Sequence, residues 1–135
     1  MGYAQWVHVI VQYLTKSGKI SVQDSKVMWG KFYKWDNKDN EISGGDVEKE
    51  TAGEGAEASI ASCGRSDASS GTEGVFDLYD GSTKICHVYW NCPWGSKTNT
   101  FTVSDINNNY MVQHTGASLD SGALGTVTVK VVKLG

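Results

Sequence analysis

The sequence contains no long apolar run, a single proline and only three cysteines. A membrane-spanning helix needs about 20 consecutive, predominantly apolar residues, and no segment approaches that length. The N-terminal stretch MGYAQWVHVIVQY is apolar, but it lacks the basic start and the small-residue cleavage site of a signal peptide. We therefore expect a protein made in the cytosol, and any export would use a route that the sequence does not show.

Motifs for metal binding and redox chemistry are also scarce. Cys63, Cys86 and Cys92 form no CxxC pair, which disfavours a zinc ribbon or a thioredoxin-type site. We expect reduced, mostly buried thiols, although one disulfide is compatible with the sequence. The acidic stretch DNKDNE (36–41) departs from an EF-hand because Lys38 stands where a ligand belongs. We interpret the three histidines as residues that fill sheet faces rather than as metal ligands: His8, His87 and His114. No metal or cofactor is expected.

The chain also lacks a clear catalytic motif. The stretch GRSDA (64–68) misses the second glycine of a nucleophile elbow, and no strand–turn–helix pattern surrounds it. Ser66 and Asp67 are better suited to shaping a turn, since both side chains can bond nearby backbone N–H groups. We therefore expect no enzyme and no catalytic residue. A small hydrolase using Ser66, Asp67 and one histidine is an alternative supported only by the presence of those residues.

The charge is uneven along the chain. Residues 36–57 contain eight of the fifteen acidic residues and two of the twelve basic ones, so the remaining chain has a net charge of +3. No basic stripe alternates with aromatic residues, which argues against nucleic acid as a partner. We interpret 36–57 as a long acidic loop with one short strand at most.

Short segments of alternating apolar and polar residues predict an all-β protein. The valines of AQWVHVIVQY (4–13) and of TVTVKVV (126–132) recur at every second position, so each set faces the core. Glycine- and asparagine-rich turns separate most of the other candidate strands, which are 18–23, 26–33, 58–63, 74–79, 83–90, 98–103 and 109–114. The sequence therefore predicts one domain over 1–135, folded as an antiparallel β-sandwich.

Aromatic residues are plentiful, with five tryptophans in 135 residues. Trp94 lies in VYWNCPWGSKTN (88–99), within a Pro-Trp-Gly turn where a large side chain is hard to bury. Tryptophan suits a membrane interface because its ring is apolar and its N–H is polar. Lys97 lies three residues later, within reach of a lipid phosphate. These features raise membrane binding as an alternative to a purely structural role for Trp94.

Six blocks of sequence together resemble the aegerolysin family. The blocks are AQWV (4–7), WGK (29–31), CGRSDAS (63–69), FDLYDG (76–81), YWNCPWGSKTN (89–99) and LDSGALGTV (119–127). The resemblance extends over nearly the whole chain, and the CPWGSKTN and SGALG blocks are specific. It implies a small β-sandwich without a conventional signal peptide that acts outside the producing cell, on target-cell membranes.

The resemblance implies a function and a partner. Aegerolysins bind sphingolipid headgroups, which are sphingomyelin with cholesterol in some members and ceramide phosphoethanolamine in others. Several recruit a larger protein with a membrane-attack-complex/perforin domain to form a two-component cytolytic, haemolytic pore. Some bacterial pairs are insecticidal, and ceramide phosphoethanolamine is abundant in insect membranes.

The family's lipid-binding residues correspond to specific positions of this chain. The implied lipid-binding residues are Trp6, Trp29, Ser70, Trp90, Trp94 and Lys97. Fungal members that bind sphingomyelin with cholesterol tend to carry an acidic residue where this chain has Ser70, and here Glu73 follows three residues later. This difference weakens the expectation of cholesterol-dependent recognition.

A lectin-like module without any pore-forming role is the main alternative function. Tyr89 and Trp90 would stack on a sugar ring, while Asn91 and Asn99 would bond its hydroxyl groups. Lipid binding without glycan binding would remove this alternative.

Overall fold

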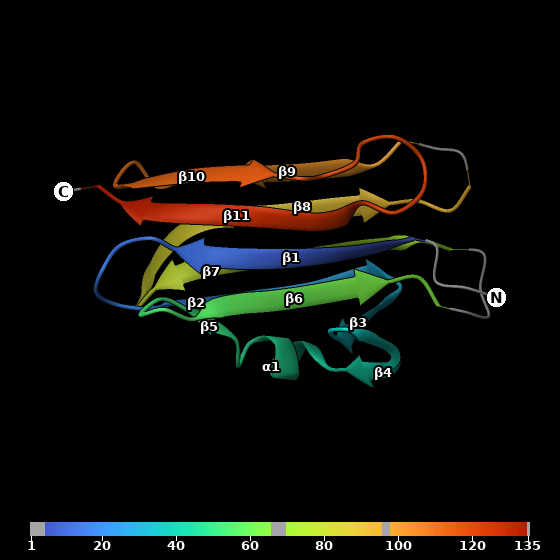
Figure 1. Cartoon of the computed structure of the whole chain (residues 1–135), viewed down its shortest axis with the longest axis horizontal. Coiled ribbons are helices and arrows are strands. Elements are labelled where there is room, and N and C mark those ends of the chain that lie inside the picture. The colour runs from blue at the N-terminus through green and yellow to red at the C-terminus, as the bar shows by residue number, and fades with distance from the viewer. Residues whose placement is uncertain (1–4, 66–69, 96–97, 135) are drawn as a thin grey trace.

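A computed structural model describes residues 5–65, 70–95 and 98–134. The chain forms two packed sheets, and in Figure 1 the larger one lies in front. In spatial order the six-stranded sheet contains β10 (Tyr110–Thr115), β11 (Gly125–Lys133), β1 (Trp6–Tyr13), β6 (Glu57–Cys63), β3 (Lys31–Lys34) and β4 (Asn37–Ile42). The five-stranded sheet contains β5 (Thr51–Ala52), β2 (Ile20–Trp29), β7 (Thr72–Asp80), β8 (Thr83–Cys92) and β9 (Thr100–Ser104). The prediction of a β-sandwich is confirmed.

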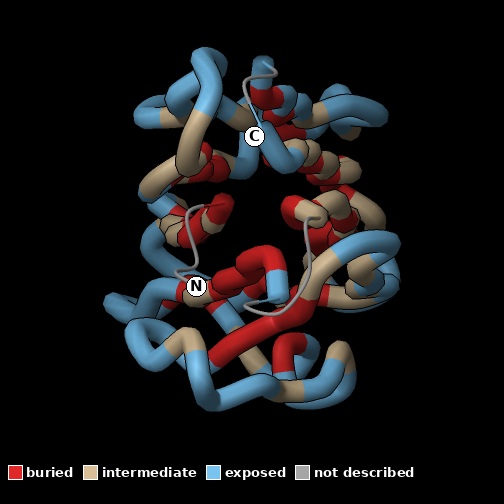
Figure 2. The backbone as a smooth tube through the Cα atoms, turned by 90° about the vertical axis from the view of Figure 1, so that its right-hand side faces the viewer, coloured by how far each residue is buried: buried red, intermediate tan, exposed pale blue. Residues whose placement is uncertain are grey.

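The core lies between the two sheets, as the alternating pattern predicted. Val7, Val9 and Val11 of β1 are fully buried, and the valines at 127, 129 and 131 of β11 face the same interior. In Figure 2 the buried stretches of the backbone lie around the interior, whereas exposed stretches lie mainly at the periphery. All the named strand pairs among the described residues are antiparallel except β1 with β11, which is parallel.

Two predicted strands, 18–23 and 26–33, are divided differently in the structure. A single strand, β2, runs from Ile20 to Trp29 across a bulge between Gln23 and Lys26. Asp24 has a φ of 55° there, a left-handed conformation that interrupts the ladder. The real break is Gly30, with a φ of 87°, because a Cβ at this position would lie 2.4 Å from the carbonyl oxygen of Cys63.

The acidic segment 36–57 is more ordered than the predicted loop. It contains β4, the one-turn helix α1 (Gly44–Val47) and β5, which Figure 1 shows along one flank of the sandwich. Ser43 caps α1 in a capping box: its hydroxyl accepts a hydrogen bond from the Asp46 backbone N–H, and its own backbone N–H donates to the Asp46 carboxylate. Glu48 then ties the segment to the β2 bulge, because its carboxylate accepts hydrogen bonds from the backbone N–H and hydroxyl of Ser25.

All three cysteines are free and buried, which decides between the open alternatives in favour of thiols. Burial raises the pKa of the Cys63 thiol to about 11 and that of the Cys86 thiol to about 12. These thiols are therefore protonated and poorly nucleophilic near neutral pH.

Candidate functional site

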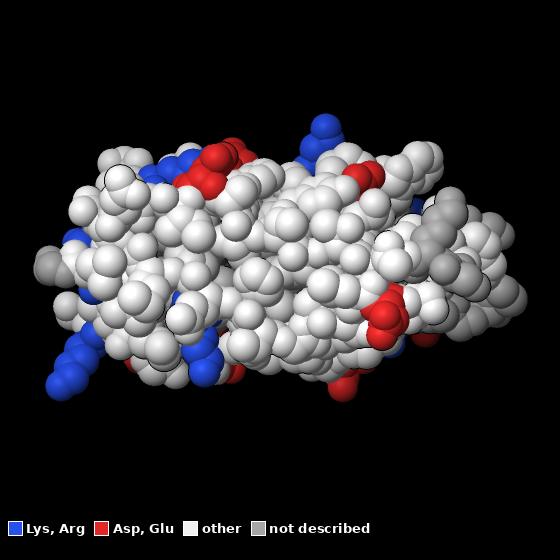
Figure 3. All heavy atoms as spheres, turned by 90° about the horizontal axis from the view of Figure 1, so that it is seen from above, with Lys and Arg blue, Asp and Glu red and all other residues white. Residues whose placement is uncertain are grey.

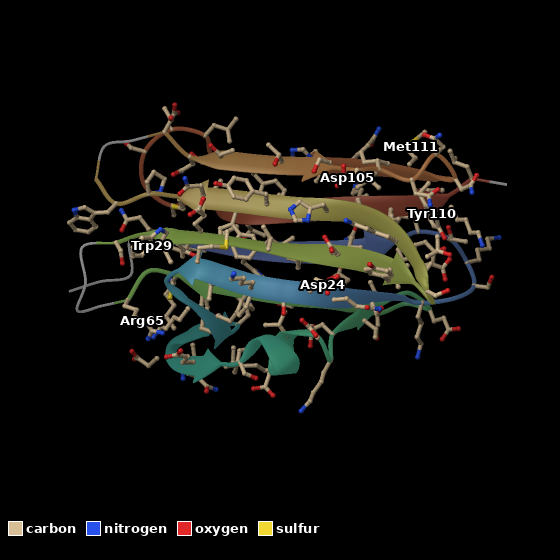
Figure 4. All side chains as sticks on the ribbon, turned by 180° about the vertical axis from the view of Figure 1, so that it is seen from behind. Asp24, Trp29, Arg65, Asp105, Tyr110 and Met111 are labelled. Carbon is tan, nitrogen blue, oxygen red and sulfur yellow. The ribbon has the colours of Figure 1, made fainter. Side chains whose placement is uncertain are left out.

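One end of the sandwich carries a hollow between two exposed tryptophans. Trp29 ends β2 and is 61% exposed, whereas Trp94 follows β8 and is 42% exposed. The hollow has a volume of about 450 Å³, and its lining residues are Trp29, Ser70, Gly71, Thr72, Glu73, Asn91, Pro93 and Trp94. Figure 4 places Trp29 at this end and Tyr110 at the opposite one. We call this surface the tryptophan end.

Strand register brings an acidic side chain next to the exposed indole. Trp29 pairs across strands with Glu73, which pairs on its other side with Asn91. The hydroxyl of Tyr89 donates a hydrogen bond to the Glu73 carboxylate over 2.5 Å. Burial and this carboxylate raise the pKa of Tyr89, so the phenol remains a donor at neutral pH. A carboxylate beside an indole ring is an arrangement that attracts an ammonium group.

The tryptophan end is held together by Asn99, which is almost completely buried. Its side-chain amide donates hydrogen bonds to the carbonyls of Ser118 and Gly122, and its backbone N–H donates to Leu119. These bonds join the CPWGSKTN segment to the loop 116–124. Leu119, which is 53% exposed, is thereby fixed beside Asn99.

The prediction that Trp90 contacts lipid is wrong. Trp90 has no exposed surface and packs in the core against Phe32 and Phe76, with ring centroids 6.2 and 6.1 Å away. Its indole N–H donates to the Thr72 hydroxyl over 3.1 Å. Strand alternation explains this position, because Val88, Trp90 and Cys92 share the inward face of β8.

The structure brings Trp29, Ser70 and Trp94 to one hollow, but it places the ring of Trp6 elsewhere. Trp6 is half-buried on the outer face of the six-stranded sheet, where its ring centroid lies 5.7 Å from that of Trp35. The Lys38 ammonium lies 4.8 Å from the Trp6 ring centroid. Lys97 lies outside the described residues, as do Ser66 and Asp67.

The sugar site predicted for the lectin alternative does not form. Trp90 and Asn99 are buried, and Asn99 bonds to backbone carbonyls. The Tyr89 hydroxyl instead donates a hydrogen bond to the Glu73 carboxylate. The prediction of a glycan site composed of these residues is therefore wrong.

The histidines lie on separate strands, β1, β8 and β10. His87 Nδ1 lies 2.6 Å from a carboxylate oxygen of Asp77, and the His114 ring contacts Phe101. Within the described ranges, no group of three or more potential ligands is placed to hold a metal ion. No helix in the same ranges is long and apolar enough to cross a bilayer.

Glu73 is the site residue that the sequence motifs did not identify. Glu73 was noted only as a neighbour of Ser70, although outward alternation between the buried Thr72 and Gly74 marks it as a surface residue of β7. Its pairing with Trp29 depends on two register shifts in β2, one between Gln23 and Lys26 and one between Val27 and Trp29, and neither has a clear sequence signal. On the face seen from above in Figure 3, the visible Lys and Arg side chains gather mainly toward the end that carries the C-terminus.

Comparisons with known proteins agree on one family. The Aegerolysin family model matches residues 4–134. Asp-hemolysin from Aspergillus fumigatus is 52% identical over 129 residues, covering 96% of this chain and 93% of the relative. Ostreolysin A6 from Pleurotus ostreatus is 45% identical over 138 residues, covering 100% and 99%. Among solved structures, RahU protein in complex with a TRIS molecule superposes with a TM-score of 0.93 at 37% identity, covering 99% and 98%.

Proposed function

Because this chain belongs to the aegerolysin family, we propose that it binds sphingolipid-containing membranes through the tryptophan end. It acts outside the producing cell on target-cell membranes, and it recruits a larger protein with a membrane-attack-complex/perforin domain to form a cytolytic pore. Sphingomyelin with cholesterol and ceramide phosphoethanolamine are the candidate receptors, the latter giving an insecticidal activity. The haemolysin and ostreolysin names of the relatives support a cytolytic role.

The single observation that carries the proposal is the exposure of two tryptophans around one hollow. An exposed indole in a folded protein is unfavourable in water, whereas at a membrane interface each ring contributes roughly 1–3 kcal/mol. Leu119 and Met28 are further exposed apolar residues, in the loop fixed by Asn99 and next to Trp29 respectively. Insertion of this kind requires no catalytic step.

The polar groups of the hollow suit a zwitterionic headgroup. Glu73 lies beside Trp29 and is positioned by Tyr89, so it provides a negative charge for the ammonium of choline or ethanolamine. Lys97, which lies outside the described residues, is the proposed contact for the phosphate. Ser70 leaves the neighbouring wall uncharged, so in this chain Glu73 takes the place of the acidic residue that the fungal sphingomyelin binders carry at the Ser70 position.

Co-sedimentation with liposomes tests the proposal. Vesicles of phosphatidylcholine alone, sphingomyelin with cholesterol, and ceramide phosphoethanolamine with cholesterol are compared at equal protein concentration. We expect binding to at least one sphingolipid mixture and none to phosphatidylcholine alone. Equal binding to all three, or to none, would contradict sphingolipid recognition.

The recruitment step is tested separately with vesicles that contain a trapped dye. A membrane-attack-complex/perforin-domain protein taken from an aegerolysin pair is added with and without this chain. We expect dye release only when both proteins are present. Release by the larger protein alone at the same rate would remove the proposed recruiting role while leaving lipid binding intact.

A further inference from the structure

A second hollow lies along the flank of the sandwich, between the outer face of the six-stranded sheet and the α1 segment. Its volume is about 600 Å³, and the residues lining it are Tyr33, Lys34, Trp35, Ile42, Asp46, Lys49, Glu50 and Ser59. None of these residues lines the hollow at the tryptophan end. We propose that this hollow, which we call the flank groove, binds a neutral sugar residue of a glycan.

An aromatic platform forms one wall of the flank groove. The Trp35 ring stacks on the imidazole of His8 with a centroid separation of 3.8 Å and an interplanar angle of 13°. Trp35 is nevertheless 39% exposed, so part of its ring remains open to a ligand. The C–H faces of a sugar ring pack well against an exposed indole, because both surfaces are apolar while their edges remain polar.

The platform is rigid before any ligand arrives. Trp35 also contacts the rings of Trp6 and Tyr33, with centroids 5.7 and 6.2 Å away. Tyr33 is 1% exposed and packs against Ala61 and Cys63 of β6. A side chain that is already ordered loses little conformational entropy on binding, which favours recognition of a small ligand.

Hydrogen-bonding groups surround this platform. The Ser59 hydroxyl lies 2.6 Å from His8 Nε2, and the Ser59 backbone N–H donates to the Glu50 carboxylate over 2.8 Å. These bonds fix the side chains of Ser59 and Glu50. The Glu50 carboxylate can still accept further hydrogen bonds. Sugar hydroxyl groups both donate and accept, so they match a wall that combines a hydroxyl with carboxylates.

The same aromatic cluster contains unused polar capacity. His8 Nδ1 and the Tyr33 hydroxyl are buried and have no hydrogen-bond partner among the residues that the structure describes. Buried polar groups are normally paired. The rings of these two residues contact Trp35, with centroids 3.8 and 6.2 Å from its own.

Charge balance selects the class of ligand. The flank groove contains two lysines, Lys34 and Lys49, and two acidic residues, Asp46 and Glu50. Lys49 and Asp46 form an ion pair at 3.4 Å. A ligand with a net charge of either sign would lie near at least one group of the same charge, which repels it, whereas a neutral sugar would leave this balance unchanged. A neutral sugar therefore fits better than a phosphate or an ammonium compound.

The test is a titration of ¹⁵N-labelled protein with single sugars, followed by nuclear magnetic resonance. The probes are the methyl glycosides of glucose, galactose, mannose and N-acetylglucosamine, each added to about 20 mM because a single sugar is expected to bind with a Kd of about 1 mM. We expect at least one sugar to shift the Trp35 indole and Ser59 amide signals in a saturable way. Trp35→Ala should weaken that binding at least tenfold, and Ser59→Ala should weaken it several-fold.

Trp94→Ala is the matched control, because it removes an exposed indole from the other hollow and should leave sugar binding unchanged. Absence of any saturable shift, or shifts centred on Trp29 and Trp94, would overturn the proposal. Shifts at Trp35 with phosphoethanolamine but with no sugar would overturn the assignment of a neutral ligand. Circular dichroism of each variant confirms that it is folded. No vesicle is involved, so failure here is distinguishable from failure of lipid binding.

Discussion

Trp90 and Trp94 lie four positions apart and have opposite environments. Trp90 is completely buried on the inward face of β8, whereas Trp94 lies beyond the end of that strand and is exposed. Sequence resemblance assigned both to lipid binding, because a family motif gives the residue type but not its direction. Strand alternation, with Trp90 between Val88 and Cys92 on the inward face, was a signal that would have separated the two.

Replacing each of these tryptophans should therefore affect a different property. Trp94→Ala should weaken binding to sphingolipid vesicles at least tenfold and change the free energy of unfolding by less than about 0.5 kcal/mol. Trp90→Phe should lower that free energy by about 2 kcal/mol, since it leaves a cavity and removes the buried hydrogen bond from the indole to the Thr72 hydroxyl. Urea unfolding and co-sedimentation measure the two effects. Normal vesicle binding by Trp94→Ala would contradict the assignment of the tryptophan end.

Glu73 provides a second test at the scale of single residues. Glu73→Gln keeps the side-chain shape but removes the charge proposed to attract a headgroup ammonium. We expect affinity for the preferred sphingolipid vesicles to fall about tenfold, equivalent to about 1.4 kcal/mol. Glu57→Gln is the control, because it removes the same charge from the exposed start of β6. Equal effects of the two variants would indicate a general change in charge rather than headgroup recognition.

At the scale of elements, the sequence predicted most strands, divided the long strand β2 into two and failed in the acidic segment. The valine alternation of β1 and β11 places each strand in the core, because burial on one face imposes a period of two. The segment from β4 to β5 was missed, because its elements have two to six residues and lack a sustained pattern. Their order depends on tertiary contacts, such as the bonds between Glu48 and Ser25.

The candidate site could be predicted only in part for a similar reason. The Pro-Trp-Gly turn marked Trp94, which is exposed as expected. The meeting of Trp29, Glu73 and Asn91 depends on pairing among β2, β7 and β8. No local pattern encodes that pairing, since it links residues far apart in the chain. Asn99 joins two specific family motifs through its buried amide, a contact invisible to residue spacing.

Asn99 therefore gives a prediction about how one loop supports the tryptophan end. Asn99→Ala should lower the free energy of unfolding by about 1–3 kcal/mol, because it removes the donors to the carbonyls of Ser118 and Gly122. Release of the loop 116–124 should also weaken vesicle binding several-fold.

Asn107→Ala is the matched control for Asn99→Ala, because Asn107 lies outside the loop 116–124. The Asn107 amide donates to the Lys84 carbonyl, between the start of β8 and the loop that precedes β10. We expect a similar loss of stability without any change in vesicle binding. Loss of vesicle binding in both variants would show that stability, rather than the position of the loop, controls the lipid contact.

At the scale of the whole molecule, the two hollows lie on different parts of the surface. The tryptophan end terminates the long axis of the sandwich, whereas the flank groove lies along one side beside α1. A molecule standing on its tryptophan end would leave this side free. The acidic segment 36–57 follows this flank through its strand–helix–strand path. The segment is therefore available to a neighbouring protein on the same membrane.

This upright orientation can be measured by hydrogen exchange on vesicles. The exposed apolar residues that flank the hollow, Trp29 and Trp94, should gain protection when sphingolipid vesicles are added, together with the loop 116–124. The opposite end also exposes apolar side chains, among them Leu14, Ile106 and Met111, and its exchange should not change. Slow exchange in the paired strands β1 and β11 should persist, because docking through residues that are already exposed requires no opening of the core. Protection around Leu14 and Met111 instead would show that the molecule binds by its other end and would contradict the orientation.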